Sequence, residues 1–182
     1  MMRGRKIPVS TLIPASEWLY DYYGKMGYVP VFDYTLEHYT ILDKPVADHF
    51  RVEAIREVGL LTDDLFNYFQ SMMRLRPCCV QHEREDFEVI VESLRMDGGA
   101  LIVVYSDKNI VGMAFAEPRE NHALVLDGMH DSEDVKRVAL WGVMKYLDAA
   151  EIYCRVLPSG KADEHRGMAR VLDVEQMLRL YA

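Results

Sequence analysis

The first forty residues combine strand-like and helical spacing of apolar positions. Residues 9–13 predict a strand, and Ser16 is a typical N-cap residue for the helix expected after it. Gly27 marks the end of this helix, and residues 28–34 and 36–41 predict two strands paired as a hairpin. One helix face is expected to carry the apolar side chains Trp18, Leu19, Tyr22, Tyr23 and Met26. Such a β-α-β-β unit buries too little surface to be stable unless it docks on something else.

Helical spacing of apolar positions continues through the next segment. Residues 43–61 are expected to form a linker that contains a helix over residues 48–58. Thr62 is expected to cap a second helix, which ends before Pro77. A third helix is predicted over residues 86–96.

The spacing changes after Asp97-Gly98-Gly99, which is a strong signal for the end of a helix. From residue 62 the predicted order is α-α-β-β-β-α-β. The later elements are strands at 101–105, 110–116, 123–127 and 151–157, a helix over 132–147 and a short last helix capped by Asp173. The crossover helix makes the last strand parallel to its neighbour. The sequence therefore predicts an α+β fold, with a mixed, mostly antiparallel sheet flanked by helices.

Composition and charge exclude several classes of protein. The 182 residues are 50% hydrophobic and 27% charged, which excludes global disorder. Lysine and arginine total 21 against 29 acidic residues, and the net charge of -8 argues against a nucleic-acid partner. The longest apolar run, residues 100–105, is much shorter than the roughly 20 residues of a membrane-spanning helix, so no membrane partner is expected.

Cysteine and histidine usage predicts no metal site. Cys78, Cys79 and Cys154 lack Cys-x-x-Cys spacing, and the six histidines are scattered. An odd number of cysteines and the lack of a signal-peptide pattern predict a reducing, cytoplasmic location.

The first helix and the strand after it resemble the end of a Gcn5-related N-acetyltransferase (GNAT) domain. The superfamily pattern there is roughly Phe-Tyr-x-x-x-Gly-Phe before a strand, and Tyr22-Tyr23 and Gly27-Tyr28 fill those places. The later α-α-β-β-β-α-β order resembles a second GNAT domain. Residues 167–175 are similar to a segment of the tandem-GNAT acetyltransferases of the "enhanced intracellular survival" type, where it leads into a sterol-carrier-like domain.

This resemblance implies a domain organisation for the chain. The parts are residues 1–42 as the partial C-terminal portion of a first GNAT domain, 43–61 as a linker helix, 62–166 as a second GNAT-like domain without a cofactor, and 167–182 as a C-terminal helical tail. The front of the first GNAT domain and the sterol-carrier-like domain are expected to lie outside the chain.

The resemblance also implies acetyl transfer from acetyl-CoA to an amine, whose identity the sequence does not define. Tyr23 would be the general acid that protonates the departing CoA thiolate. The alternative is an aromatic side chain that packs on the helix face. Trp18 and Tyr22 would line a substrate pocket, or belong to the core and an interface.

A GNAT enzyme holds the CoA pyrophosphate with a Gln/Arg-x-x-Gly-x-Gly/Ala loop that opens a helix. Residues 95–100 match these letters, but they follow a helix and precede a strand, which favours a helix C-cap. The loop is expected at residues 127–134, where Gly128 is accompanied by Asp127, Asp131, Glu133 and Asp134. A carboxylate near a phosphate costs on the order of a few kcal/mol. Acetyl-CoA is therefore implied by the family, and no site for it is securely encoded in this chain.

Other candidate residues have plain structural alternatives. Cys78 or Cys79 is either a reactive thiol or a small buried hydrophobic residue at a helix end. His82, among acidic neighbours, is either a ligand or base or part of a solvated first helical turn. His122 and His130 flank the strand that begins near Ala123, without partners nearby in the sequence.

Two classes of function stay open at this level. One is an N-acetyltransferase-like enzyme, and the other is a non-catalytic GNAT-fold scaffold that forms homo-oligomers through an uncovered apolar edge. A thiol enzyme using Cys78 or Cys79 is the third and least supported hypothesis.

Overall fold

The computed structural model describes residues 7–40, 49–77, 79–158, 160, 162 and 164–179. The strands are β1 (Val9–Leu12), β2 (Val29–Thr40), β3 (Phe50–Ile55), β4 (Ala100–Ser106), β5 (Asn109–Pro118), β6 (Ala123–His130), β7 (Glu151–Val156) and β8 (Glu164–Val171). The helices are α1 (Trp18–Gly24), α2 (Asp63–Arg74), α3 (Arg84–Met96), α4 (Glu133–Leu147) and α5 (Val174–Arg179), with a short 3-10 turn η2 (Val58–Leu60).

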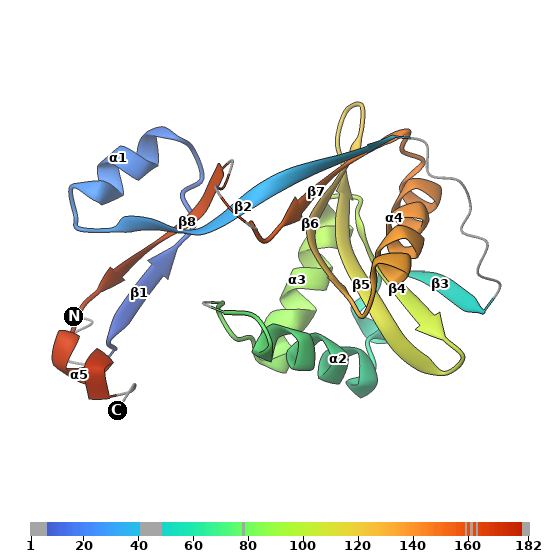
Figure 1. The fold of residues 1–182 in the computed structure, drawn as a ribbon, viewed down its shortest axis with the longest axis horizontal. Coiled ribbons are helices and arrows are strands. Elements are labelled where there is room, and N and C mark those ends of the chain that lie inside the picture. Colours follow the sequence, from blue (N-terminus) through green and yellow to red (C-terminus); the bar gives the residue numbers. More distant parts are fainter. Residues whose placement is uncertain are drawn as a thin grey trace. The chain divides into compact units, whose positions relative to one another are not determined.

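The strands form an α+β fold of the expected class. Hydrogen-bonded neighbours run in the order β1-β8-β2-β7-β6-β5-β4-β3, and the described pairs are antiparallel except for the parallel pair β6–β7 (Figure 1). The chain divides into two compact units, residues 1–35 with 157–182 and residues 36–156. Strand β2 contributes residues 29–35 to the first unit and 36–40 to the second.

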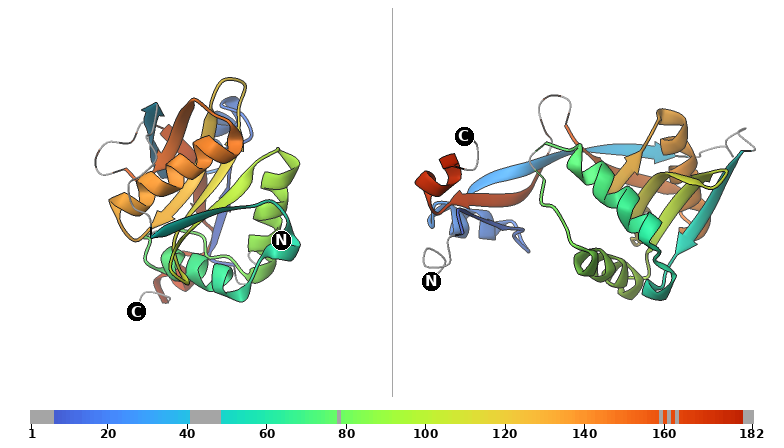
Figure 2. Two further views of the ribbon diagram at one scale, coloured as in Figure 1. Left: turned by 90° about the vertical axis from the view of Figure 1, so that its right-hand side faces the viewer. Right: turned by 90° about the horizontal axis from the view of Figure 1, so that it is seen from below.

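The unit of residues 36–156 is a sheet with helices on both faces (Figure 2). Ile102 and Val104 of β4 face α4, while Leu101 and Val103 face α2 and α3. All four side chains are buried because successive residues of a strand point to opposite faces and both faces are covered. This strand reads as a continuous apolar run for that reason.

The other unit is a small three-stranded sheet with α1 and α5. Strands β1 and β2 pair with opposite edges of β8, both antiparallel. The Tyr20 hydroxyl of α1 donates a hydrogen bond to the backbone carbonyl of His165 in β8 at 2.8 Å. Tyr28 and Ser10 share a hydroxyl–hydroxyl hydrogen bond of 2.8 Å.

Several predicted helix ends are confirmed. A first-turn backbone amide donates to the side chain of each of the predicted caps Thr62 and Asp173, and likewise to Ser132, where the expected helix of residues 132–147 begins. Gly98 has a φ of 75° and ends α3, and the Gly99 amide donates to the Leu94 carbonyl at 2.7 Å. Residues 95–100 are therefore the helix C-cap that their context favours. The predicted cap Ser16 is wrong, because Glu17 is the residue before α1 and no side chain caps this helix.

The expected helix in the 43–61 linker is wrong where the structure describes it. Phe50–Ile55 forms strand β3, which pairs with β4 along its whole length. Arg51 and Glu53 alternate with apolar residues, and this period of two decides the structure over the helical spacing of Val52, Ile55 and Val58. Residues 41–48 lie outside the described part.

Two further expectations about strands are corrected. The hairpin of residues 28–34 and 36–41 is one continuous strand, β2, through Thr40. Strand β8 (Glu164–Val171) runs into the expected helical tail of 167–182, so only Val174–Arg179 of the described tail is helical. The N-terminal part of the first unit therefore has the order β-α-β. The third strand of its sheet, β8, comes from the C-terminal part of the chain.

Candidate functional site

The resemblance to a GNAT domain predicts the cofactor loop at the junction of β6 and α4. Strand β6 pairs with β5 as far as His130, but its described pairing with β7 covers Ala123, Leu124 and Val125. Val125 lies opposite Ala116 and Asp127 opposite Phe115, so Leu126 is an extra residue on β6. Such a bulge bends a strand, and β6 continues past the paired stretch toward α4.

The backbone of β6 beyond this bulge has one edge directed away from β5. The Asp131 amide donates to the Val111 carbonyl of β5 at 3.0 Å. Hydrogen-bonded and non-hydrogen-bonded pairs alternate along antiparallel strands, so Gly128 and His130 direct their backbone groups to the opposite edge. These backbone groups are the ones to which an extended ligand with amide groups would bind, by pairing with β6 as an added strand does.

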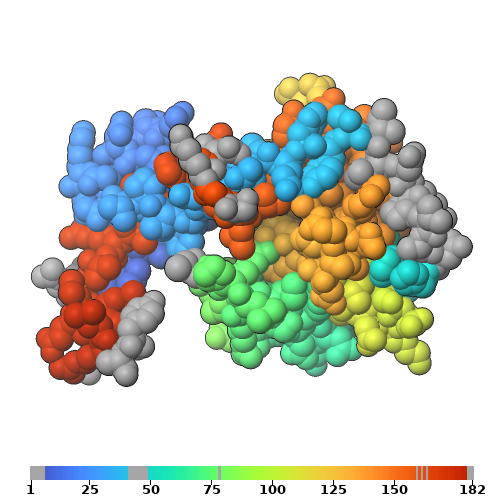
Figure 3. Space-filling model, in the orientation of Figure 1, coloured from blue at the N-terminus to red at the C-terminus, as the bar shows by residue number. Residues whose placement is uncertain are grey.

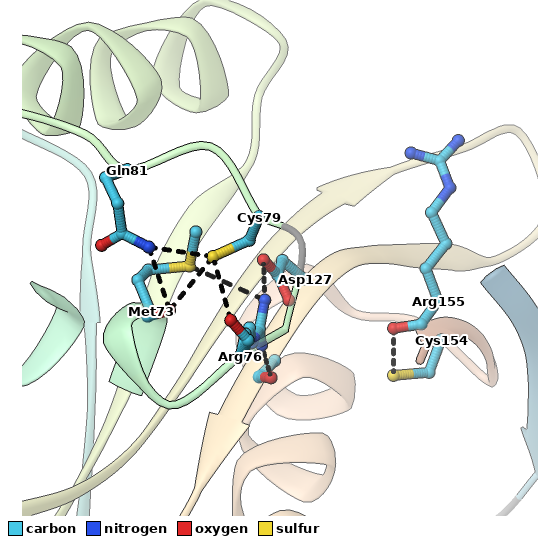
Figure 4. Close-up of polar contacts among 8 residues, drawn as sticks. Met73, Arg76, Cys79, Gln81, Asp127, Cys154 and Arg155 are labelled. Carbon is cyan, nitrogen blue, oxygen red and sulfur yellow. Dashed lines mark hydrogen bonds and ion pairs between the residues drawn. The ribbon is translucent and has the colours of Figure 1, made fainter. Parts of the chain in front are cut away.

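Arg76 occupies part of that edge. This residue follows α2, and its guanidinium donates to Asp127 Oδ2 and to the Gly128 carbonyl, each at 2.7 Å (Figure 4). The side chains of Arg76 and Asp127 are 18% and 29% exposed, so the pair is largely shielded from water. The contact connects the end of α2 to β6, and the Gly128 carbonyl at this edge already accepts a hydrogen bond from Arg76.

Acidic side chains surround the start of α4. Tyr68 of α2 places its hydroxyl 2.8 Å from the Val111 carbonyl and 2.9 Å from Asp131 Oδ1. Burial, and then the Asp131 carboxylate, raise the pKa of Tyr68 above its ordinary value. Glu133 and Asp134 follow in the first turn of α4, where the helix dipole favours negative charge.

The nearest lysine of α4 is already paired. Lys136 Nζ lies 2.6 Å from Glu37 Oε2, and the Tyr39 hydroxyl donates to the same oxygen at 2.5 Å. Both partners come from the part of β2 that lies against α4 in the space-filling view (Figure 3). Burial lowers the pKa of Lys136, but the bonds with Glu37 and Tyr39 outweigh burial and raise it overall.

His130 lies between these charged groups. Burial, and then the positive charges of Lys136 and Arg76, lower its pKa, while Glu133 at 3.8 Å partly opposes them. The histidine is therefore held toward its neutral form, which adds no positive charge to the junction.

The residues at this junction do not fit the pyrophosphate of acetyl-CoA. The Val111 carbonyl occupies the Asp131 amide, and the Ser132 hydroxyl and carbonyl occupy the amides of Val135 and Lys136. Arg76 and Lys136 are committed to carboxylates. A phosphate brought to this helix start would therefore meet Asp131, Glu133 and Asp134 with neither cation available.

The three residues predicted as catalytic and pocket residues lie together on α1. Tyr23 is half-buried, and its ring contacts Tyr22 at a centroid distance of 5.3 Å and Tyr28 at 5.9 Å. Trp18 and Tyr22 meet edge to face at 6.2 Å. The roles of Tyr23 as general acid and of Trp18 and Tyr22 in a pocket stay predictions.

The other candidates are dispersed. Cys79 is half-buried and donates to the Met73 carbonyl, while Gln81 donates to its sulfur at 3.0 Å (Figure 4); Cys78 lies outside the described residues. His82 lies 3.9 Å from Asp86, and His122 packs edge to face on Tyr153. Among the described residues, no group of three or more His, Cys, Asp or Glu is placed to hold a metal ion. None of the helices in the described part could span a membrane.

The contacts of Arg76, Lys136 and Glu37 carry no local sequence signal, because their partners are 51 and 99 residues away. Tyr68 had a signal. It shares a helix face with Leu65, and a half-buried tyrosine hydroxyl requires a hydrogen-bond partner.

No family model and no curated protein matches the sequence. Solved structures do match. A conserved protein of unknown function from Enterococcus faecalis V583, described as a probable N-acyltransferase, matches with a TM-score of 0.67 and 12% identity over 97% of this chain and 48% of its own. A GCN5-related N-acetyltransferase from Kribbella flavida matches with a TM-score of 0.64 and 16% identity. The match covers 96% of this chain and 45% of the Kribbella chain. Eis1 from Mycobacterium abscessus matches with a TM-score of 0.55 and 12% identity. The match covers 97% of this chain and 50% of Eis1.

These similarities establish the fold. The chain has a GNAT fold, and it spans about half the length of the solved chains it matches.

Proposed function

We propose that residues 36–156 form a GNAT-fold scaffold domain that does not bind acetyl-CoA, within a protein of the N-acetyltransferase class. The acetyltransferase class is supported by the fold and by the Tyr22-Tyr23 and Gly27-Tyr28 pattern. The scaffold role rests on one observation: Arg76, the cation beside this junction, is bound to Asp127 and to the Gly128 carbonyl.

The electrostatics of the junction support the same conclusion. Two cations near the helix start, Arg76 and Lys136, each face a carboxylate at 2.6–2.7 Å. Displacing either one to reach a phosphate would leave a carboxylate, Asp127 or Glu37, without its partner, which disfavours such a move.

Calorimetric titration tests the proposal. Acetyl-CoA is added to the full chain at concentrations up to the millimolar range, with an active GNAT enzyme as the positive control and circular dichroism to verify folding. The proposal expects heats equal to those of dilution. Saturable binding that weakens when Ser132 or Gly128 is replaced would overturn it, because both residues lie where the pyrophosphate loop is expected.

A further inference from the structure

Phe32 has a backbone conformation that is unusual for a bulky residue inside a strand. Its φ is 60°, in the left-handed region that glycine adopts without strain. Of the other described residues, Asp107 and Asp148 also combine a side chain with a positive φ. Asp107 lies in the turn between β4 and β5, and Asp148 is the C-cap of α4, which are places where aspartate tolerates this conformation. Phe32 has no such explanation, because it lies within β2.

The strain is confined to this one residue. Its neighbours pair regularly with β8, since Val31 lies opposite Gly167 and Asp33 lies opposite His165 (Figure 1). Asp33 Oδ1 and His165 Nδ1 are 2.7 Å apart, which fixes the position directly after Phe32. A single strained residue in an otherwise regular strand persists only where its surroundings hold it.

The packing of its ring on Gly167 is what holds Phe32. A Cβ atom at Gly167 would lie 3.0 Å from Phe32 Cδ2 and 3.1 Å from the Leu12 carbonyl oxygen. The half-buried ring therefore occupies space that the side chain of any other residue at this position would fill. Aromatic packing across neighbouring strands stabilises a sheet, and here it opposes the strain of the backbone.

An ordinary strand conformation is open to the same residue. Rotation of the Val31–Phe32 peptide by about 180° would bring the φ of Phe32 to about −120°, a value typical of strands, while the rest of β2 keeps its place. The rotation also turns the Cα–Cβ bond of Phe32, so the ring would leave its position over Gly167. One state therefore has the ring packed and the backbone strained, and the other has the ring released and the backbone relaxed.

We propose that Phe32 is a two-state conformational switch in β2, in which ring packing on Gly167 is exchanged for relief of backbone strain. A ligand or partner of this small sheet that prefers one state would shift the balance between the two. The inference goes beyond the proposed scaffold role and does not depend on it, because Phe32 and the junction of β6 and α4 belong to different units.

NMR spectroscopy of the full wild-type chain tests both states. A positive φ brings the amide proton and the Hα of the same residue close together, so Phe32 is expected to give a strong intraresidue NOE that ordinary strand residues lack. Relaxation dispersion should show exchange on the microsecond-to-millisecond timescale at the amides of Val31, Phe32 and Asp33. A weak intraresidue NOE at Phe32, or no exchange at these amides, would overturn the proposal.

Two variants are expected to move the switch to its relaxed state. Gly167→Ala places a methyl group against the ring, and Phe32→Ala removes the ring. In both variants residue 32 should lose the strong NOE and the exchange, because the packing that opposes the strain is gone. Gly24→Ala is the matched control in the same unit. No atom lies within 4 Å of a Cβ built at Gly24, so Phe32 should behave as in the wild type.

Phe32→Ala decides the outcome if Gly167→Ala does not fold, because the second variant also crowds the Leu12 carbonyl and the first adds no atom. A positive φ that survives at residue 32 in Phe32→Ala would show that the ring does not hold the strained backbone, and the proposal would then be wrong. The same conclusion follows if Gly24→Ala abolishes the NOE and the exchange as Phe32→Ala does.

Discussion

At the scale of single residues, Arg76 is the side chain that closes the candidate site. Replacing it with alanine leaves the carboxylate of Asp127 and the carbonyl of Gly128 without their shared donor. We expect Arg76→Ala to lower the free energy of unfolding by about 1–3 kcal/mol, measured by urea denaturation.

Arg95→Ala is the control for this prediction. Arg95 pairs with Glu92 on the exposed face of α3, so its loss should leave the urea midpoint close to that of the wild type. Equal midpoints for Arg76→Ala and Arg95→Ala would show that the contact of Arg76 with β6 is not important for stability.

His130 predicts a specific dependence of stability on pH. Its pKa in the folded protein is lowered from 6.5, first by burial, so the folded state binds fewer protons than the unfolded state once the pH falls below that value. Stability is therefore fully present above about pH 6.5 and is lost as the pH falls toward the lowered pKa.

His130→Gln should remove this contribution. The difference between urea midpoints at about pH 7.5 and about pH 5.5 is expected to be smaller in the variant than in the wild type. Carboxylates such as Glu37 lose their contribution at lower pH. Burial raises the pKa of Glu37, but its bonds to Lys136 and Tyr39 outweigh burial and lower that pKa overall. An identical difference in both proteins would mean that His130 does not contribute to stability in this range.

At the scale of helices and strands, local signals predicted the elements of residues 62–156 well. Thr62 and Ser132 cap α2 and α4, and the parallel pair β6–β7 follows from the crossover helix. The errors lie where pairing between distant segments decides the structure. Strand β8 has no regular apolar alternation and forms because β1 and β2 pair with both of its edges.

Close packing of α4 on the sheet gives a prediction at the same scale. A Cβ atom at Gly142 would lie 2.7 Å from Val52 Cγ1 and 2.9 Å from Ile102 Cγ2, both on stiff β-branched side chains. Overpacking costs about 1–3 kcal/mol, and we expect it to outweigh the roughly 1 kcal/mol by which alanine favours a helix.

Gly142→Ala should therefore lower the thermal midpoint, measured by circular dichroism. Gly24→Ala is the matched control, because no atom lies within 4 Å of a Cβ built at Gly24 in α1. Stabilisation by both substitutions would show that α4 can move away from β3 and β4 without cost.

At the scale of the whole molecule, the fold and the proposed lack of acetyl-CoA binding depend on different kinds of residue contact. The α+β class and the acidic start of α4 could be predicted from the sequence, because both depend on local spacing. The bond of Arg76 to β6 and the pair Lys136–Glu37 could not, because folding brings these distant residues together. A GNAT fold therefore does not by itself imply a working cofactor site.

The most direct test of this account is an NMR titration of the full chain with acetyl-CoA, which records the backbone amides of Gly128, His130, Asp131 and Ser132. The account predicts that these amide signals stay unchanged up to millimolar ligand, because carboxylates surround them and Arg76 and Lys136 are already paired. Saturable shifts centred on these four amides would contradict it and would identify the junction of β6 and α4 as a working cofactor site.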